Sequence, residues 1–452
     1  MKSAIVVLLG VLVSIGCVST ADKKTNGKNA QGQTFYVDSS KGNDESTGLA
    51  EESPWKTFAN LKIREIKPGD TILLKRGEVW FDTLSIEAKG TEAQPVRIGT
   101  YGEGQTLPII SGSVSAVEIE WKKLTGNIWS AQVAASEGEE PLRAFQGDKS
   151  YRQEFLKERF RRLKAEGDWA WESTDGGTLF VRSTHSPASW REPLEFNVRR
   201  YGIDIRGGSH FSIEGVAVVR ARDGLRVRGG HGVIKNLVAE ENSVNGVVIN
   251  GGWNRIENVR SLQNRVGFFI EGEDNQLDQI VARENIEDGI QFGPESGGGN
   301  SVNGAKISGN GENCIDVRNG DQQINGGELA SDAETSSGCI LAHKNPLAVR
   351  IQSAKLSSLK SGPAVYVSDG SRVSVDRCEL KSDESSVILL AETAGNGSVI
   401  VDSKIGPGGS KSKSLIEVRH GRGHRISGNT FMASDGVVAT KVNGSAAIMT
   451  DD

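Results

Sequence analysis

A short repeat constrains the fold of this chain more than any other feature. Copies with the same turn residues begin at 223, 245, 266, 288 and 313, so successive copies lie 22, 21, 22 and 25 residues apart. Each copy contains three short apolar stretches, as in "GVVI", "RIENV" and "SL" within 246–262. Weaker copies begin at 338, 363 and 414. No copy contains the long apolar stripe with a period of about 3.6 residues that a helical repeat needs.

Three short strands per copy predict an all-β fold, a single-stranded right-handed parallel β-helix. Asn residues recur at two places in the repeat, where their side-chain amides can hydrogen-bond along the stacking direction. We expect these residues to belong to the scaffold. The first place holds Asn236 and Asn258, with Gln279 following, and the second holds Asn242, Asn264, Asn285 and Asn310.

The N-terminus has the pattern of an export signal. Lys2 precedes an apolar run from Ala4 to Gly16, so we expect a signal peptide at 1–21 and a polar tether at 22–33. "VSIGC" resembles a bacterial lipoprotein cleavage site, which implies a lipid on Cys17; the alternative is ordinary cleavage after Ala21. We therefore expect export to the periplasm, outer membrane or cell surface as a lipoprotein, or otherwise secretion. The membrane is then a partner only through the lipid.

Residues 34–113 are expected to form an N-terminal cap and the first coils. They include an amphipathic segment at 54–66 that predicts a short helix over the open end of the β-helix. With the run "GTEAQPVRIGTYGEGQTLPIISGS", this region resembles the N-terminus of secreted bacterial β-helix proteins of the pectate-lyase-like kind. The resemblance covers about 35–113 and 200–440 and implies a polysaccharide partner. The net charge of −5 gives no reason to expect nucleic acid, and we expect a monomer.

Residues 114–200 interrupt the repeat and are expected to form an elaboration beside the coils. They contain a run, "SYRQEFLKERFRRLKAEGDW", that resembles a basic helix. One interpretation is a sugar-stacking wall with arginines that attract an acidic polymer. The alternative, which we favour, is a small satellite core with a solvated helix. Of the eight Trp residues, only Trp253 lies in the regular coils at 201–448. The region itself holds Trp121, Trp129, Trp169, Trp171 and Trp190, with Arg159, Arg161 and Arg162 in the basic run.

Residues with outward parity on the strand that opens each repeat are the candidates for chemistry, because inward residues fill the core. Glu271, Gln291, Asp316, Arg318, His343, Lys344 and Tyr366 are expected to line one groove. The expected inward set is Leu225, Val227, Val247, Ile249, Phe268, Ile270, Ile290, Phe292, Ile315 and Val317. In pectate-lyase-like enzymes this outward face carries the active site, and the resemblance implies the same here.

A second resemblance concerns the run "LIEVRHGRGHRISGNTF" at 415–431. It is similar to the "LRHG…GN.F" run of the chondroitinase B and alginate lyase family, and Arg419 matches the family's arginine. The resemblance implies β-elimination, with calcium neutralising the uronate carboxylate. The preceding coil, "SSVILLAETAG", has neither the lysine nor the pair of glutamates expected from that family. We expect Arg419 to matter less than Arg318 and Lys344, because its neighbouring strand is expected to present Ile388 and Leu390 outward.

Elimination requires a base and a cation that stabilises the enolate-like charge. We therefore expect catalytic roles among Arg318, Lys344, His343, Tyr366 and Arg419. Arg226, Arg228, Asn250 and Gln291 are expected to bind substrate, and Glu271 and Asp316 to hold Ca²⁺ if a metal is used.

Three classes of function remain open at this point. A lyase is favoured; the alternatives are an inverting hydrolase using Glu271 and Asp316, and a non-catalytic surface protein that binds carbohydrate or has a structural role. The "GHG" at 230–232 falls in a turn and is rejected as a polygalacturonase motif. Cys314, Cys339 and Cys378 do not form a disulfide framework, and the first two are expected to be buried, stacked thiols.

Overall fold

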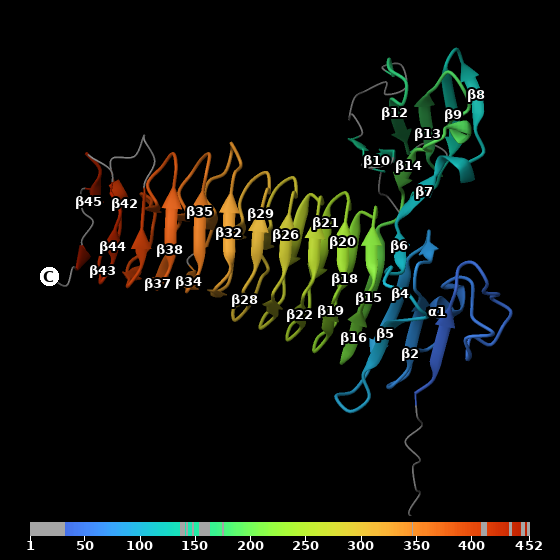
Figure 1. Ribbon diagram of the computed structural model, residues 1–452, viewed down its shortest axis with the longest axis horizontal. Helices are drawn as coiled ribbons and strands as arrows, with labels where there is room; N and C mark the ends of the chain where they lie inside the picture. The colour runs from blue at the N-terminus through green and yellow to red at the C-terminus, as the bar shows by residue number, and fades with distance from the viewer. Residues whose placement is uncertain are drawn as a thin grey trace, which may run out of the picture. The chain divides into compact units, whose positions relative to one another are not determined.

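A computed structural model (Figure 1) describes residues 32–135, 141, 143–146, 149–152, 163–173, 176–345, 347–407, 414–433, 436–443 and 448–449. The predicted signal peptide and tether, Cys17 included, lie outside the described residues except for 32–33. Within this part of the chain, three parallel sheets dominate the fold, and each coil contributes one strand to each sheet. The arrows of successive coils point the same way in Figure 1. The predicted right-handed parallel β-helix is confirmed, with about 14 coils.

We call the sheets A, B and C. Sheet A contains β1 (Thr34–Val37), β2 (Thr71–Lys75), β5 (Val96–Tyr101), β16 (Phe211–Glu214), β19 (Val233–Lys235), β22 (Arg255–Glu257), β25 (Gln276–Asp278), β28 (Ser301–Asn303), β31 (Gln322–Asn325), β34 (Ala348–Gln352), β37 (Arg372–Asp376), β40 (Val399–Val401), β43 (His424–Ser427) and β46 (Ile448–Met449). Sheet B contains β3 (Val79–Trp80), β6 (Ile109–Ser111), β17 (Ala217–Val219), β20 (Val238–Glu240), β23 (Arg260–Leu262), β26 (Val281–Arg283), β29 (Lys306–Ser308), β32 (Glu328–Ser331), β35 (Lys355–Ser358), β38 (Glu379–Ser382), β41 (Lys404–Ile405) and β44 (Thr430–Phe431).

Sheet C opens each repeat and carries the outward face that the sequence singled out. It contains β4 (Leu84–Lys89), β15 (Tyr201–Ser209), β18 (Asp223–Val227), β21 (Asn245–Ile249), β24 (Val266–Ile270), β27 (Ile290–Phe292), β30 (Ile315–Val317), β33 (Ile340–Ala342), β36 (Val365–Val367), β39 (Ile388–Leu390), β42 (Ser414–Val418) and β45 (Val438–Val442).

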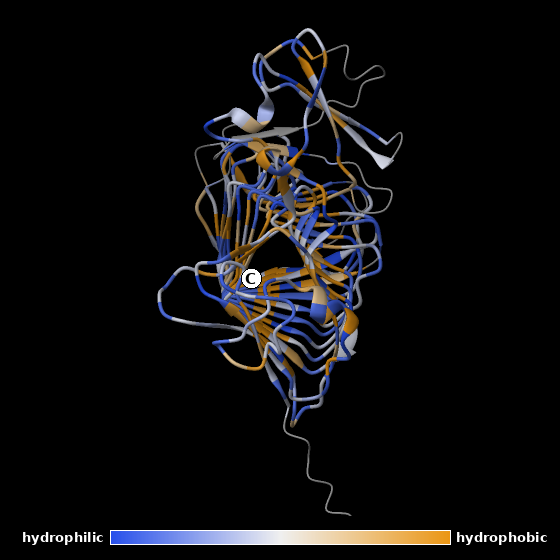
Figure 2. Cartoon of the chain, turned by 90° about the vertical axis from the view of Figure 1, so that its right-hand side faces the viewer, coloured by the Kyte–Doolittle hydropathy of each residue, from blue (hydrophilic) through white to orange (hydrophobic). Residues whose placement is uncertain are grey.

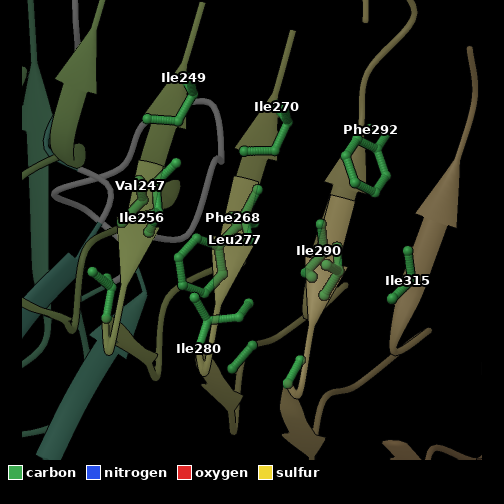
Figure 3. Close-up of a cluster of buried hydrophobic side chains, with 14 of the residues drawn as sticks. Val247, Ile249, Ile256, Phe268, Ile270, Leu277, Ile280, Ile290, Phe292 and Ile315 are labelled. Carbon is green, nitrogen blue, oxygen red and sulfur yellow. The ribbon is translucent and has the colours of Figure 1, made fainter. Parts of the chain in front are cut away.

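The core is a stack of equivalent residues along the coils. Phe268 pairs with Ile290 and Ile290 with Ile315, and all three side chains are fully buried. Figure 3 shows this stacking across four neighbouring coils. Viewed along the stacking direction, hydrophobic stretches recur at the same places from coil to coil (Figure 2). Every residue of the predicted inward set on sheet C is buried, so the expected parity is confirmed.

Buried amide ladders link neighbouring coils, as predicted. Asn242 Nδ2 donates to Asn264 Oδ1 (2.9 Å), and Asn285 Nδ2 donates to Asn310 Oδ1 (2.8 Å). At the exposed turn between sheets A and B, Asn258 Nδ2 donates to Asn236 Oδ1 (2.7 Å), so this pair links neighbouring coils at the surface. The sequence reasoning missed a third ladder in the turn between sheets C and A, formed by Asn254, Asn275 and Asn300.

The capping helix is shorter than expected. Helix α1 covers only Ala59–Ile63, whereas the sequence predicted a helix over 54–66. Trp55 makes a parallel bridge with Val37 instead, and its backbone N–H donates to Tyr36 (2.9 Å). The first residues of the expected helix therefore extend the sheet, and Phe58 and Leu61 supply the buried cap.

The elaboration consists mainly of two antiparallel sheets with a core of its own. Trp169 and Trp171 are buried in this core, so they cannot form a sugar-stacking wall. The beginning of the run expected to form a basic helix is instead part of strand β11, and 163–165 at its other end are not helical. The residues between them, 153–162 with the three arginines, lie outside the described residues. The strands are β7 (Ser113–Ser115), β8 (Lys122–Thr125), β9 (Ile128–Gln132), β10 (Arg143–Gln146), β11 (Lys149–Arg152), β12 (Trp169–Glu172), β13 (Thr178–Arg182) and β14 (Glu195–Asn197), with 3₁₀ turns η1 (Ala116–Glu118) and η4 (Pro187–Ser189).

The elaboration contacts the turns that join sheet B to sheet C. Arg143 Nη1 donates to the Gln263 carbonyl (3.0 Å), and Asn197 Nδ2 donates to Ser243 Oγ (3.0 Å). It therefore lies beside the N-terminal ends of the sheet C strands in the first regular coils. Across the described residues, α1 and the other helical segments are too short or too polar to cross a membrane.

Cys314 and Cys339 are buried free thiols in adjacent coils, as expected, with their sulfur atoms 2.6 Å apart. Cys378 is also free and buried.

Candidate functional site

Two outward columns run along sheet C, and the strand register fixes their members. Gln291 pairs with Asp316, Asp316 with Leu341, and Leu341 with Tyr366. The second column begins one residue after each short strand and places Arg318 beside His343, because the backbone N–H of His343 donates to Val317 (3.1 Å). The structure thus brings together residues that the sequence placed in one groove.

Asp316 joins the two columns. Its Oδ2 accepts a hydrogen bond from Arg318 Nε (2.6 Å), and its Oδ1 lies 2.9 Å from His343 Nε2. The Asp316 side chain is only 2% exposed, whereas the side chains of His343 and Arg318 are 19% and 27% exposed. A buried carboxylate therefore holds one imidazole and one guanidinium at the surface. Because the carboxylate accepts from Nε2, it favours the tautomer in which Nδ1 is the free basic nitrogen.

A second buried carboxylate lies beneath this group. Asp288 accepts hydrogen bonds from Gln291 Nε2 (2.9 Å) and from Asn313 Nδ2 (2.8 Å). Gln291 Nε2 also lies 3.4 Å from Asp316 Oδ2, so one amide bridges the two acids. Burial, together with the negative charge of Asp316, raises the pKa of Asp288 to about 6, although the hydrogen bonds from Asn313 oppose this shift.

A hollow of about 620 Å³ opens beside His343 on the same face. Leu341, Tyr366 and Leu389 contribute its apolar surface, and Ser368 and Thr393 contribute hydroxyl groups. Tyr366 is half-buried and lies one coil beyond His343. We refer to Asp316, Arg318, His343 and Tyr366, with this hollow, as the His343 site.

The expected substrate-binding residues lie apart from the His343 site, except for Gln291. Arg226 Nε donates to Asp204 Oδ1 (3.0 Å), and its guanidinium carbon lies 3.7 Å from the centre of the Tyr201 ring. Arg228 Nη2 lies 3.6 Å from Asp204 Oδ2. Asn250 is exposed directly after β21. These residues form a largely basic group four to five coils before His343.

Lys344 is placed differently from the sequence expectation, whereas Glu271 lies in the second outward column as predicted, two coils before Arg318. Lys344 lies outside the outward columns, in the turn after β33 with φ 73°, and its backbone N–H donates to Asp369 Oδ2 (3.0 Å). Glu271 lies near Glu295, and burial, with the charge of Glu295, raises the pKa of Glu271. The expected metal pair of Glu271 and Asp316 therefore does not fit Ca²⁺, because Glu271 faces a different partner and both Asp316 oxygens are engaged. Among the described residues, no group of three or more acidic, His or Cys side chains could hold a metal ion.

Arg419 belongs to a separate charged group. Its Nε donates to Glu417 Oε1 (3.0 Å), and its Nη1 donates to Glu392 Oε1 (3.0 Å). The expectation that Ile388 and Leu390 point outward beside it is wrong, because both are fully buried and Leu389 takes the outward position. The strand has the same parity as its neighbours, so alternate residues point inward throughout sheet C.

Sequence reasoning missed Asp288 and Asn313. Both lie before the strand proper, at positions equivalent to Asp223 and Asn245 in earlier coils, where Asp223 Oδ1 accepts from Asn245 Nδ2 (2.7 Å). The recurring Asp-Gly and Asn-Gly pairs at 223, 245 and 288 predict turns, and a turn alone does not indicate a site. The repetition of an acid followed one coil later by an amide was the signal that could have found them.

Comparisons with known proteins agree with the fold. Residues 194–327 match the family described as right handed beta helix region. A Lacto-N-biosidase of Bifidobacterium longum subsp. longum is 31% identical over 100 residues; the chain spans about 6% of the length of that protein, through 21% of its own.

Two solved structures extend the comparison. That of XylC with xylose has a TM-score of 0.51 at 14% identity, covering 90% of this chain and 76% of that one. Pectate lyase Pel9A has a TM-score of 0.44 at 14% identity, covering 84% and 81%. At these identities, the likeness to XylC concerns the fold.

Proposed function

We propose that this protein cleaves an acidic, uronate-containing polysaccharide by β-elimination at the His343 site. The observation that carries the proposal is the bonding of Asp316, which is buried and holds Arg318 and His343 side by side at the surface. The local similarity to a Lacto-N-biosidase supports a carbohydrate ligand in general terms. The chemistry is argued from the chain's own residues.

His343 is the proposed base. Its Nδ1 accepts the proton from the carbon α to the uronate carboxylate, while Asp316 at Nε2 stabilises the imidazolium that forms. Arg318 binds the uronate carboxylate and stabilises the enolate-like charge. The electron pair of the broken C–H bond forms the new C=C bond, and the glycosidic C–O bond on the neighbouring carbon breaks. Tyr366 donates its hydroxyl proton to the leaving oxygen, which completes the elimination.

The basic group at Arg226 and Arg228 supports a polyanionic substrate. It lies on the same face of sheet C as His343 and five coils before it, and coils stack about 4.8 Å apart, so the two sites are separated by roughly 24 Å. A polymer of several residues spans this distance. We propose that these arginines, each close to Asp204, attract the acidic chain toward the outward face.

A hydrolase is the second candidate, favoured by the raised pKa of Asp288 beside Asp316. Paired carboxylates with different proton affinities are what glycoside hydrolysis needs. The shared contact with Gln291 keeps Asp288 Oδ2 and Asp316 Oδ2 closer than about 6.5 Å, the lower end of the inverting range. Both acids are about 1% exposed, however, so neither reaches a sugar in this conformation. The exposed groups are the imidazole and the guanidinium, which favours elimination.

The test is a panel of polygalacturonate, alginate, chondroitin sulfate and neutral polysaccharides, each assayed with and without a calcium chelator. Elimination produces the ultraviolet absorbance of an unsaturated uronate, whereas hydrolysis produces reducing ends without it. Reducing ends without this absorbance would indicate hydrolysis by the Asp288 and Asp316 pair instead of elimination at His343. Binding without either product would leave a non-catalytic carbohydrate-binding protein and overturn the proposal.

We also propose export with lipid attachment at Cys17, supported by the sequence alone. Cys17→Ser should release the mature protein from the membrane fraction while its circular dichroism stays unchanged. A mature N-terminus at Asp22 would contradict lipid attachment and favour ordinary cleavage.

A further inference from the structure

A column of aromatic rings lies on the turn between sheets C and A, away from the His343 site. His210, His231 and Trp253 occupy equivalent positions in three successive coils. The His210 and His231 ring centres are 4.9 Å apart with an angle of 11° between their planes. The His231 and Trp253 centres are 5.5 Å apart at 10°. The three rings therefore form one flat stack that ends at Trp253.

Trp253 is not a core residue, and its backbone conformation is unfavourable. Trp253 is 52% exposed, and its backbone φ is 56°. A bulky residue in this left-handed region costs about 1–2 kcal/mol relative to glycine. Two later coils place Gly299 and Gly320 in this turn, also with positive φ. Packing in the core does not explain a strained, exposed indole at this position.

The next coil leaves the outer face of the indole open. Asp274 occupies the position equivalent to Trp253 in the next coil. The backbone N–H of Trp253 donates to the Glu273 carbonyl, and that of Asp274 donates to the Gly298 carbonyl in the same way. The Asp274 carboxylate occupies the space that a Cβ on Gly299 would take, so it leans away from Trp253 toward the following coil. Within the described residues, His231 is the only ring stacked on Trp253, and it covers one face.

We propose that Trp253, with Glu273 and Asp274, binds a neutral polysaccharide. The open face of an indole stacks on the C–H face of a pyranose ring, and exposed carboxylates accept hydrogen bonds from sugar hydroxyls. The two carboxylates repel uronates, so this site selects against the acidic polymer proposed for sheet C. His343 lies four coils farther on, about 19 Å along the stacking direction, so the two sites are separate. The site would hold the protein on a neutral glycan and does not depend on the proposed lyase activity.

The test is native affinity electrophoresis of the purified protein in gels that contain xylan, mixed-linkage β-glucan or galactomannan. At least one of these should retard the wild-type protein, and Trp253→Ala should weaken that binding at least about tenfold, or about 1.4 kcal/mol. Leu124→Ala is the matched control, because Leu124 is a similarly exposed apolar residue (54%) on the elaboration. It should migrate as the wild type does.

A second variant tests the selectivity. Glu273→Gln combined with Asp274→Asn keeps the indole and removes both charges, so polygalacturonate retardation should increase. Circular dichroism confirms that each variant is folded. The proposal is overturned if no neutral polysaccharide retards the wild type, if Trp253→Ala binds as the wild type does, or if Trp253→Ala loses only polyuronate binding.

Discussion

Sheet C carries the same local motif twice, and the two copies have different surroundings. "IDVRNG" at 315–320 and "IEVRHG" at 416–421 each place an acid and an arginine two residues apart on the outward face. In both, the arginine Nε donates to the acid, at 2.6 Å for Arg318 and Asp316 and at 3.0 Å for Arg419 and Glu417. Within the six residues of the motif, the spacing of the acid and the arginine does not distinguish the two copies.

The neighbouring coils make the difference. By register, Pro294 in the coil before Arg318 is equivalent to Glu392 in the coil before Arg419. The coil after Glu417 supplies Lys441 and Asn443, whereas the coil after Asp316 supplies Leu341 and His343. Arg419 is therefore shared between two carboxylates, and Glu417 lies close to two cations. At these positions in the neighbouring coils, only the first copy has an imidazole, that of His343. Its arginine, unlike Arg419, faces no second acid at these positions.

Glu417 in the second copy and Asp288, which lies beneath the first copy, have pKa values shifted in opposite directions. Burial raises the pKa of Glu417, but the hydrogen bond and charge of Arg419, with those of Lys441, outweigh it, so this pKa lies below its usual range. The buried acid beneath the first copy, Asp288, has a raised pKa. Its counterpart in the second copy is Ser386, which donates to Glu417 Oε2 (3.3 Å). In a β-helix, the coil on either side thus decides what a motif can do.

The largest expected effect separates the two copies by activity. His343→Ala removes the proposed base and should lower turnover of a uronate polymer at least about 100-fold, the range for general base catalysis. Arg419→Ala should leave turnover near the wild-type rate, because Glu392 and Glu417 already neutralise this arginine. Initial rates of unsaturated product formation measure both. If Arg419→Ala alone abolished turnover, the second copy would be the active one.

Much of this site could be predicted from the sequence. The repeat gave the parity of sheet C, which placed Asp316, Arg318 and His343 on one face. The alternation within one strand does not show which of these residues touch, because that depends on the register between neighbouring coils of 25 residues. Lys344 was misplaced because the turn after β33 bends its backbone to positive φ. Asp288 was missed because it precedes the regular strand and its raised pKa arises from burial.

The second prediction concerns pH and stability. The pKa of Asp288 rises from its usual 3.8 to about 6 in the folded protein. Between these values the native state keeps a proton that the unfolded chain has lost. The free energy of unfolding should therefore fall as pH rises through this window, by up to about 3 kcal/mol. Asp288→Asn cannot ionise and should remove this decline, as measured by urea unfolding at pH 4.5 and 7.5.

Glu417→Gln provides the opposite sign. Because the folded-state pKa of Glu417 is lowered, its contribution is present above the usual pKa of the carboxyl group and is lost as pH falls. The variant should therefore lose stability relative to the wild type at pH 7.5 more than at acidic pH. Equal pH profiles for Asp288→Asn and the wild type would contradict the burial argument for the first copy.

The third prediction makes the first copy resemble the second. Pro294→Glu places a carboxylate at the position equivalent to Glu392, where it can bind Arg318. Turnover should fall roughly tenfold, or about 1.4 kcal/mol, because the arginine would be neutralised before the uronate arrives. The fold should survive, since Pro294 is exposed and the hydrogen bond from Asn319 Nδ2 goes to the backbone carbonyl of Pro294, which the variant keeps. Pro294→Gln is the control without charge. A similar loss in both variants would show that backbone geometry, not charge, is responsible.

The smallest expected effect is the converse change, which makes the second copy resemble the first. The backbone N–H of Asn443 donates to Val418 (2.9 Å), as that of His343 does to Val317, so Asn443→His places an imidazole beside Arg419. We expect this change to restore no turnover in the His343→Ala background. Glu392 still shares Arg419, and Lys441 Nζ still lies 3.4 Å from Glu417 Oε1. Within the described residues, sheet C ends at β45, so no later coil supplies a counterpart of Tyr366. Recovery of unsaturated product in the double variant would mean that the acid–arginine motif and one imidazole suffice, and that the neighbouring charges do not set the two copies apart.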